Sequence, residues 1–398
     1  MSNALSYRDY RIFWAGSVIS RCGDGVQEVA EDWLVFVMTG SPFLLGLVAF
    51  CKAPSRMLLA PIFGAVIDRV DRKKLMLALY CFQIILTVVY GLLITTKVIL
   101  FWHIIVLTLL DSLVAPLIRV TRQTVIPDLV PKESLLSAIS LNSVGNNTAQ
   151  VVGPFLGGIL ILWLGVDGVF YLNAISFCAI IASFFVIRIP QKQADSGKLD
   201  IMGDVREGLY FIKNHAIILD VMVMQFISFF VALPFTRLFP VYAKDILNIG
   251  PTGLGLLRGC LAGGSVMGGL GLLSFGEIEN KQRLLTVTAL ATALFVALFA
   301  YSSWLPFSLV CLVAIGIASM IFRASGLTLI QLNVPDEFRG RVMGLYHLEA
   351  GFRSIGALLY GAAASLVGTP MTVLLGAVVF GVMSLSAESF IKSRLSAP

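Results

Sequence analysis

Long apolar runs separated by short polar connections extend over nearly the whole chain. Two of them, 43–67 and 75–96, flank the polar loop between Asp68 and Lys74. A helix needs roughly 20 apolar residues to cross a bilayer, and both runs reach that length. The same pattern predicts twelve spans: 11–38, 43–67, 74–96, 101–126, 135–163, 167–188, 217–243, 251–276, 283–302, 305–333, 342–367 and 370–391. Because helices satisfy their own backbone hydrogen bonds in lipid, the expected fold is an all-α membrane protein of twelve transmembrane helices.

Composition agrees with this prediction and excludes several classes of function. Hydrophobic residues make up 58% of the chain and charged residues only 13%, whereas soluble domains carry about 25% charged residues. The six cysteines lie in apolar runs without paired spacing, so neither a disulfide framework nor a metal site is expected. The glycine-rich stretch from Gly259 to Gly271 lacks the Lys-Ser/Thr ending of a phosphate loop. The sequence therefore supports no nucleotide-driven pump, no enzyme and no cofactor.

The distribution of Lys and Arg sets the expected orientation. With the N-terminus inside, 19 of these cations fall in cytoplasmic segments, Arg122 among them, and only Lys97 and Lys244 fall outside. Cations near the ends of spans collect on the cytoplasmic side. We therefore expect both termini in the cytoplasm and a multi-pass protein of the cell inner (cytoplasmic) membrane. Because topology accounts for the net charge of +6, nucleic acid is not an expected partner.

Short sequence matches indicate that the two halves of the chain repeat each other. Ile126-Pro127-Asp128 recurs 208 residues later as Val334-Pro335-Asp336. Ile19-Ser20 recurs at the same offset as Ile227-Ser228. Matches at one common offset indicate a duplicated six-span unit.

The duplication predicts the domain organisation. We expect six-helix bundles at 1–189 and 215–398, related by pseudo-twofold symmetry. A polar cytoplasmic linker at 190–214 would join them, with a short interfacial helix from Asp204 to Asn214. Transporters built in this way bind their substrate between the halves, near the middle of the membrane.

The loop from Gly64 to Lys74 fits the pattern G-x-x-x-D-R-x-x-R/K-R/K. On this loop and on several further segments, the chain resembles the major facilitator superfamily. Within the superfamily it is similar to the proton-antiporter branch that contains macrolide pumps and siderophore exporters of the enterobactin type. The further segments are Tyr10 to Gly16, Gly23-Asp24, Ile126 to Pro131 and Phe338 to Met343. The resemblance covers most of the chain and implies a transporter of two six-helix bundles that works by alternating access.

The resemblance also implies that the loop acts as a gate. Asp68 would close the cytoplasmic side by engaging the N-terminus of the helix that starts near Val342. A carboxylate at a helix N-terminus is favoured by about 0.3–1 kcal/mol. Gly64, Arg69 and Arg72 would complete the gate. The alternative is that the cations of the loop serve only as topology anchors.

A second motif, Gly153 to Gly158, resembles the glycine-proline motif of exporters in this superfamily. Pro154 lacks a backbone donor and kinks a helix, while small residues such as Gly153 permit close helix approach. The resemblance favours export and a gating role for Gly153 and Pro154. Plain helix packing is the alternative.

Eight cations remain inside the predicted spans. They are Arg21, Lys52, Arg56, Arg119, Arg237, Arg258, Arg323 and Arg353. An ionisable group in a span costs at least about 2.5–3.5 kcal/mol unless it is paired or faces a polar cavity. These residues are therefore expected to line a hydrated pathway or to pair with acids.

Acidic residues gather on one face of the first span. Arg21, Asp24, Glu28, Glu31 and Asp32 fall within an arc of roughly 100° and form a stripe about 16 Å long. We expect proton coupling at its four carboxyls, since burial disfavours a charged carboxyl and a nearby cation favours it. Asp24 also matches a position of the resembled family and is a candidate gating residue. The alternative is an ion-pair network with Lys52 and Arg56 that locks the first two spans together.

The remaining charges divide into one further acid and a set of arginines. Asp111 is another candidate proton carrier, with an ion pair to Arg119 or Arg56 as the alternative. Arg237, Arg258 and Arg323 have no acidic residue in the middle of their own spans, so their charges favour an anion. The expected substrate-binding set is Arg56, Arg119, Arg237, Arg258, Arg323 and Arg353. For Arg353 we also expect an ion pair with Glu349, four residues away on the same helix.

These observations predict a secondary transporter that exports a small, amphipathic, anionic and siderophore-like molecule by proton antiport. A broad-specificity drug or macrolide pump and a lysolipid flippase are the alternatives. A receptor or scaffold would need a dry cavity, which the eight buried cations argue against. The expected partners are the substrate, protons and the lipid bilayer, and the expected state is a monomer.

Overall fold

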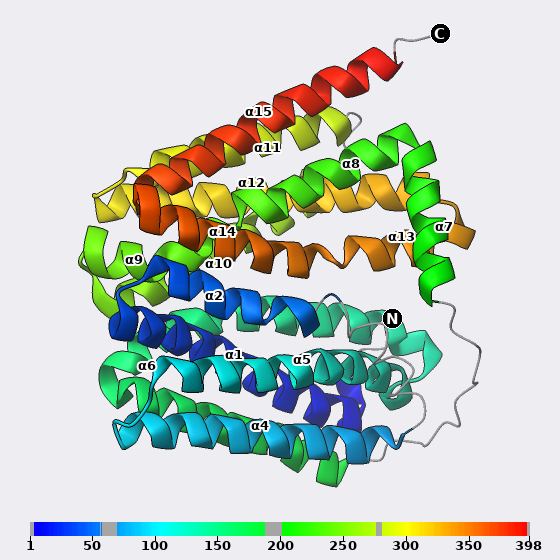
Figure 1. Ribbon diagram of the computed structural model, residues 1–398. Coiled ribbons are helices and arrows are strands. Elements are labelled where there is room, and N and C mark those ends of the chain that lie inside the picture. Colours follow the sequence, from blue (N-terminus) through cyan, green and yellow to red (C-terminus); the bar gives the residue numbers. More distant parts are fainter. Residues whose placement is uncertain (1–3, 56, 58–69, 188–200, 276–280, 396–398) are drawn as a thin grey trace. The chain divides into compact units, whose positions relative to one another are not determined.

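The fold is described by a computed structural model that covers residues 4–55, 57, 70–187, 201–275 and 281–395. Every regular element in these ranges is a helix (Figure 1). The elements are η1 (Ala4–Ser6), α1 (Arg8–Thr39), α2 (Pro42–Cys51), α4 (Arg72–Thr95), α5 (Phe101–Leu129), η3 (Lys132–Ser134), α6 (Leu135–Val186), α7 (Ile201–Asn214), α8 (Ala216–Ile227), η4 (Ser228–Ala232), η5 (Pro234–Leu238), α9 (Phe239–Val241), η6 (Tyr242–Ile246), α10 (Gly250–Phe275), α11 (Lys281–Ala300), α12 (Leu305–Asn333), α13 (Asp336–Tyr346), α14 (Glu349–Val367) and α15 (Thr369–Leu395). The predicted all-α fold is confirmed.

The lengths of the helices fit a chain that crosses a membrane many times. Within the described ranges, nine helices are long and apolar enough to span a bilayer, and α2 is a shorter apolar helix. One of the nine, α6, covers two predicted spans, because Gly165 interrupts its backbone with a φ of 74°, a conformation that glycine adopts without a steric cost. α1 also has the length of a span, 32 residues, but carries several charges. Division of α6 at Gly165, together with α1 and α2, gives the twelve transmembrane helices expected from the sequence.

The turn between α1 and α2 shows how local sequence ends one span and starts the next. Gly40 has a φ of 60° and donates its backbone N–H to the Phe36 carbonyl, which closes α1. Ser41 then caps α2 by accepting a hydrogen bond from the Leu44 N–H, with Pro42 at the first helical position. The reversal therefore needs no more than two residues.

The described chain forms two compact units. Of the described residues, those within 1–40, 54–199 and 249–259 form unit 1, and those within 41–53, 200–248 and 260–398 form unit 2. The two units do not correspond to the first and second halves of the sequence. α2, from the first half, belongs to unit 2, and the first part of α10, from the second half, belongs to unit 1. The chain passes from unit 1 to unit 2 within α10, between Gly259 and Cys260. The predicted division at 190–214, which concerns duplication of the sequence, stays a prediction.

Each unit has its own apolar core. In unit 1, side chains from α1, α4 and α6 meet around Tyr10, Tyr80 and Phe177. In unit 2, side chains from α8, α12 and α15 meet around Phe322 and Phe380, whose rings stand edge to face with centroids 5.9 Å apart. Aromatic pairs prefer this geometry over a face-to-face sandwich.

Glycines allow the closest helix contacts in both units. In unit 1, a Cβ on Gly255 of α10 would lie 2.8 Å from the Cα of Gly158 in α6. In unit 2, a Cβ on Gly361 of α14 would lie 2.5 Å from the Pro42 carbonyl oxygen of α2. Both distances are shorter than real Cβ contacts, so a larger residue would separate the helices. The close approach explains why α2 and the first part of α10 associate with these helices.

The seventh predicted span is an irregular helix. A π turn, η4, follows α8, and the 3-10 segment η5 begins at Pro234. Proline has no backbone N–H, so the regular helical bonding stops there. The Tyr360 hydroxyl of α14 donates a hydrogen bond to the Val231 carbonyl inside this irregular stretch. Backbone groups that leave a helical pattern inside a membrane need such partners.

The linker region contains the helix expected there. α7 runs from Ile201 to Asn214 and packs against α13 in unit 2. Arg341 Nη1 lies 2.8 Å from Glu207 Oε2, and the rings of Phe211 and Phe338 stack with centroids 4.5 Å apart. A position at the membrane surface stays a prediction.

Candidate functional site

Four of the predicted site residues lie outside the described residues: Arg56, Gly64, Asp68 and Arg69. The end of the signature loop is described. Asp71 caps α4, since its Oδ1 accepts hydrogen bonds from the backbone N–H groups of Lys73 (2.9 Å) and Lys74 (3.1 Å). This cap fixes the first turn of α4 and thereby the position of Arg72.

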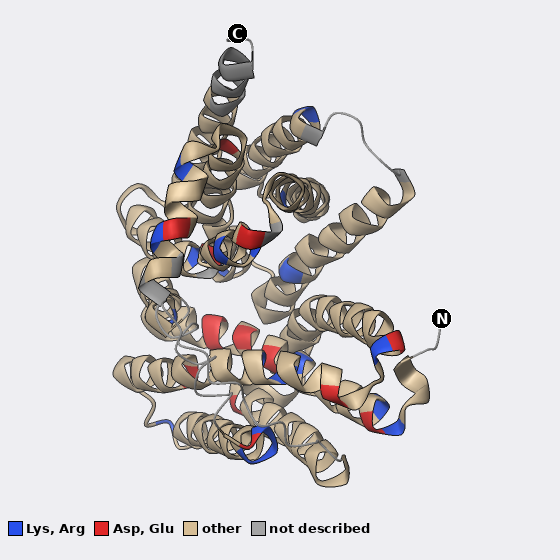
Figure 2. Ribbon diagram, turned by 90° about the vertical axis from the view of Figure 1, so that its right-hand side faces the viewer, with Lys and Arg blue, Asp and Glu red and all other residues tan. Residues whose placement is uncertain are grey.

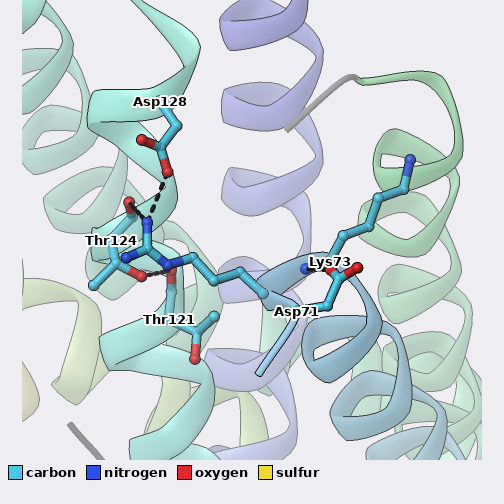
Figure 3. A network of polar contacts seen from close by, with 6 residues as sticks. Asp71, Lys73, Thr121, Thr124 and Asp128 are labelled. Carbon is cyan, nitrogen blue, oxygen red and sulfur yellow. Dashed lines mark hydrogen bonds and ion pairs between the residues drawn. The ribbon is translucent and has the colours of Figure 1, made fainter. Parts of the chain in front are cut away.

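Arg72 joins α4 to α5. Its Nη1 lies 2.8 Å from Asp128 Oδ2 and 3.3 Å from the Thr124 carbonyl oxygen (Figure 3). The Asp128 side chain is only 3% exposed. Asp128 belongs to the Ile126-Pro127-Asp128 motif that recurs in the second half of the chain. This recurrence was the sequence signal that Asp128 has a specific role, and its partner is Arg72 of the signature loop. A charged hydrogen bond of this kind is stronger than a neutral one.

The carboxyl stripe of α1 lies among partners from other helices of unit 1. Charged positions are few along the ribbon, which is mostly tan in Figure 2. Glu31 is buried and accepts a hydrogen bond of 2.7 Å from the Thr108 hydroxyl of α5. Asp32 is also buried and forms an ion pair with Arg258 of α10. Glu28 Oε1 lies 3.7 Å from Arg258 Nη1, and its side chain is 40% exposed.

The pairing of Arg258 corrects one premise of the sequence analysis. Arg258 was expected to lack an acidic partner, because its own span contains none. The structure supplies two, Asp32 and Glu28, from a helix more than 220 positions earlier in the chain. The charge of Arg258 is therefore balanced by the protein itself and gives no argument for an anionic substrate.

A second group of charges in unit 1 surrounds Asp24. The side chain of Asp24 is exposed, and the charges of Arg21, Arg122 and Asp111 act on it. Arg21 Nη2 donates a hydrogen bond of 2.8 Å to Asn142 Oδ1. For Asp111, the structure shows a hydrogen bond of 3.0 Å from Gln83 Nε2. Arg119 belongs to the same group, since Asp24 and Arg122 act on it electrostatically.

Arg122 has a buried side chain, which the sequence did not indicate. Its side chain is 6% exposed within unit 1, and its expected place on the cytoplasmic side stays a prediction. It donates a hydrogen bond to the Tyr80 hydroxyl, and its guanidinium carbon lies 5.9 Å from the centre of that ring. Its Nε has no hydrogen-bond partner in the described structure. The position near a span end gave no signal of this burial.

In unit 2, charged residues lie on α12 and on α14, the helix that follows α13. Arg323 is exposed and donates to the sulfur of Met320 at 3.5 Å. Glu349 begins α14, and the charges of Arg323 and Arg353 both act on it. The expected Glu349–Arg353 ion pair stays a prediction, and Glu349 Oε2 is buried without a hydrogen-bond partner in the part of the chain described here. Arg237 lies in the 3-10 segment η5.

The glycine-proline motif contacts two helices of unit 1. A Cβ on Gly25 of α1 would lie 2.9 Å from Pro154 Cδ, and a Cβ on Gly153 would lie 2.8 Å from the Cys22 carbonyl oxygen. Five residues later, Gly158 meets α10. The motif is thus a contact surface between α1 and α10, the two helices that carry Asp32 and Arg258. Among the described residues, no three His, Cys, Asp or Glu side chains are grouped so that they could hold a metal ion.

Comparison with known proteins assigns the chain to a family. A family model described as "Transmembrane secretion effector" (MFS_3) matches residues 3–397. The chain belongs to this family of the major facilitator superfamily. Its fold agrees, since a mutant of the nucleoside transporter NupG superposes with a TM-score of 0.79 at 13% sequence identity, over 96% of this chain and 99% of the other. The chain is thus a multi-pass secondary transporter and not an enzyme.

Two curated relatives of this secretion effector differ in their substrates. Macrolide efflux protein A of Streptococcus pyogenes is 23% identical over 83% of each chain. The staphyloferrin A transporter of Staphylococcus aureus is 22% identical over 91% of each chain. At this level of identity the relatives agree on small-molecule transport and leave the substrate open.

Proposed function

We propose that this secretion effector exports a small amphipathic anion, siderophore-like in chemistry, in exchange for protons and by alternating access. The observation that carries the proton exchange is the binding of Asp32 and Glu28 on α1 by Arg258 of α10. A proton and the guanidinium group compete for the same carboxylates. The protonation state is therefore linked to the attachment of α10 to α1.

The position of this ion pair suits a coupling role. The chain leaves unit 1 directly after Arg258, between Gly259 and Cys260. In alternating access, one bundle moves against the other. Protonation of Asp32 would loosen an attachment that lies just before that passage, and the partly exposed Glu28 would be the point at which protons enter. Glu31, Asp24 and Asp111 remain further candidate carriers in the same unit.

Arg323 is the arginine of the set that favours an anionic substrate. No carboxylate among the described residues lies within 4.0 Å of its exposed guanidinium group, whereas Arg258 has two. An arginine can hold a carboxylate in a planar, two-pronged contact. Arg323 is therefore the residue to which we assign the substrate anion, with Arg353 and Arg237 as further members of the set.

Transport measurements test the proton exchange. In proteoliposomes, an imposed pH gradient should drive uptake of labelled substrate. This uptake should be lost in Glu28→Gln and Asp32→Asn. Glu207→Gln is the matched control, since Glu207 is an exposed acid of α7 at 58% exposure. Proton-driven transport that persists unchanged in both α1 variants would remove Glu28 and Asp32 from the coupling.

A second candidate function is broad drug efflux, including macrolides. The observation that favours it is the 40% exposure of the Glu28 side chain, which leaves an anionic oxygen accessible to a cationic drug. The effect of one substitution on two substrates distinguishes the two candidate functions. Arg323→Ala should weaken transport of a tricarboxylate siderophore at least tenfold and that of a macrolide little; equal losses would contradict the anionic substrate.

The remaining parts of the proposal concern gating and topology. We propose that the Arg72–Asp128 pair, with Asp68 and Arg69 of the same loop, stabilises one state of the gate. Gly153 and Pro154 would serve as the surface on which α1 and α10 meet. We further propose a monomer in the cytoplasmic membrane with both termini in the cytoplasm. Cysteine labelling from each side of the membrane tests the orientation.

A further inference from the structure

We propose that Glu349 takes up a proton when an anionic group binds to Arg323, so that unit 2 contains a proton-linked anion site distinct from the carboxyls of α1. This inference rests on the proposed function, since the anionic group belongs to the exported substrate. The site lies where the eleventh predicted span is interrupted, between Tyr346 at the end of α13 and Glu349 at the start of α14.

Two buried oxygen atoms at this interruption lack hydrogen bonds. Tyr346 is 4% exposed, and its hydroxyl has no partner in the described structure. Glu349 Oε2 is equally enclosed and also has none there. The two side chains adjoin each other without a well-formed hydrogen bond. A buried polar group without a partner costs about 1–3 kcal/mol, and such groups in a native protein call for an explanation such as a ligand, a water or a functional role.

The charges that face Glu349 are positive. Arg323 of α12 and Arg353 of α14 act on it, and His347 lies in the interruption itself. Of the elements that pack against α14, α2 is followed by Lys52 and η5 contains Arg237, and neither element contains an acid. η4 has no charged residue, and the charges of α15 begin only at Glu388. Among the described side chains of these elements, Glu349 is therefore the acid that can balance Arg323.

This arrangement makes an arriving anion and ionised Glu349 competitors for the same cations. Two unit charges about 4 Å apart repel each other by about 4 kcal/mol at an effective dielectric constant of 20. When two anionic groups share such a site, one of them binds a proton. Glu349 is the group that stays in the site and is largely enclosed by protein, so it is the one that accepts the proton. The proton taken up at this binding step is separate from those exchanged at α1.

Linkage fixes the size of the effect. If binding of the anion is accompanied by uptake of one proton, its affinity changes tenfold for each unit of pH. The dissociation constant should therefore fall about tenfold per unit of acidification over the range in which Glu349 titrates. Without Glu349 the affinity should vary little over the same range.

Calorimetry on the purified full-length protein tests this inference. Citrate is the probe, as a simple tricarboxylate, and each titration is run in two buffers that differ in ionisation enthalpy. The difference in apparent heat gives the number of protons taken up. We expect about one for the native protein and for the exposed-acid control Glu207→Gln, and none for Glu349→Gln. Glu349→Asp, which keeps the carboxyl, should restore proton uptake and guards against a general loss of structure.

The outcomes separate the inference from the proposal on which it rests. Equal proton uptake in the native protein and in Glu349→Gln overturns the role of Glu349. Citrate binding that is weakened by Arg323→Ala but takes up no proton overturns this inference alone. Absence of binding by both citrate and a tricarboxylate siderophore overturns the anionic substrate as well.

Discussion

Asp32→Asn tests the ion pair on which the coupling argument depends. The variant keeps the shape of the side chain and removes its charge, so that Arg258 loses its nearer carboxylate. We expect a lower free energy of unfolding and a weaker attachment of α10 to α1. The matched variant at the other end of the pair is Arg258→Met, which keeps the length of the side chain and removes the guanidinium group.

The expected magnitude follows from burial. The side chains of Arg258 and Asp32 are 12% and 6% exposed, and removal of one partner from a buried pair costs about 3–5 kcal/mol. Glu28 remains 3.7 Å from Arg258 in the variant but is 40% exposed, so it compensates only in part. We therefore expect a loss of about 3 kcal/mol for Asp32→Asn and of less than about 1 kcal/mol for Glu28→Gln.

A double-mutant cycle measures the pair directly. The free energies of unfolding of the native protein, both single variants and the double variant Asp32→Asn/Arg258→Met are compared in mixed micelles. The double variant should lose less than the sum of the two single losses, because neither charge is left without a partner. Losses that add within about 0.5 kcal/mol would show that the two groups do not interact, and the coupling argument would fall with them.

Three further predictions concern other contacts of unit 1. Gly255→Val should separate α10 from the α6 backbone, since even a Cβ would lie 2.8 Å from it; transport should fall sharply, and unaltered disulfide trapping between cysteines placed on α6 and α10 would contradict this. Arg72→Ala leaves Asp128, at 3% exposure, without its cation and should cost about 3 kcal/mol, measured by thermal unfolding in detergent; Asp128→Asn in the same background should recover part of the loss. Tyr80→Phe removes the hydroxyl that Arg122 binds and should lower stability by about 1–3 kcal/mol, whereas no change would indicate that a water replaces it.

The sequence predicted the parts of the structure that depend on neighbouring residues along the chain. The length of each apolar run decides whether it can cross a membrane, and the twelve expected helices are present. Local turn chemistry is equally readable, as at Gly40 and Ser41. The glycine-proline motif of α6 makes close helix contacts, the alternative that the sequence left open, while its gating role stays a prediction.

The partners of the charged residues were decided by the tertiary structure. Arg258 was taken to need an external anion because its own span has no acid, and Arg122 was counted only as one of the cytoplasmic cations. The structure pairs the first with Asp32 and buries the second beside Tyr80. Hydropathy is summed over consecutive residues, so it describes one helix at a time and contains no information on contacts between helices. The energy of a charge in a membrane depends instead on which helices pack around it, and small residues far apart in the chain, such as Gly158 and Gly255, determine that packing.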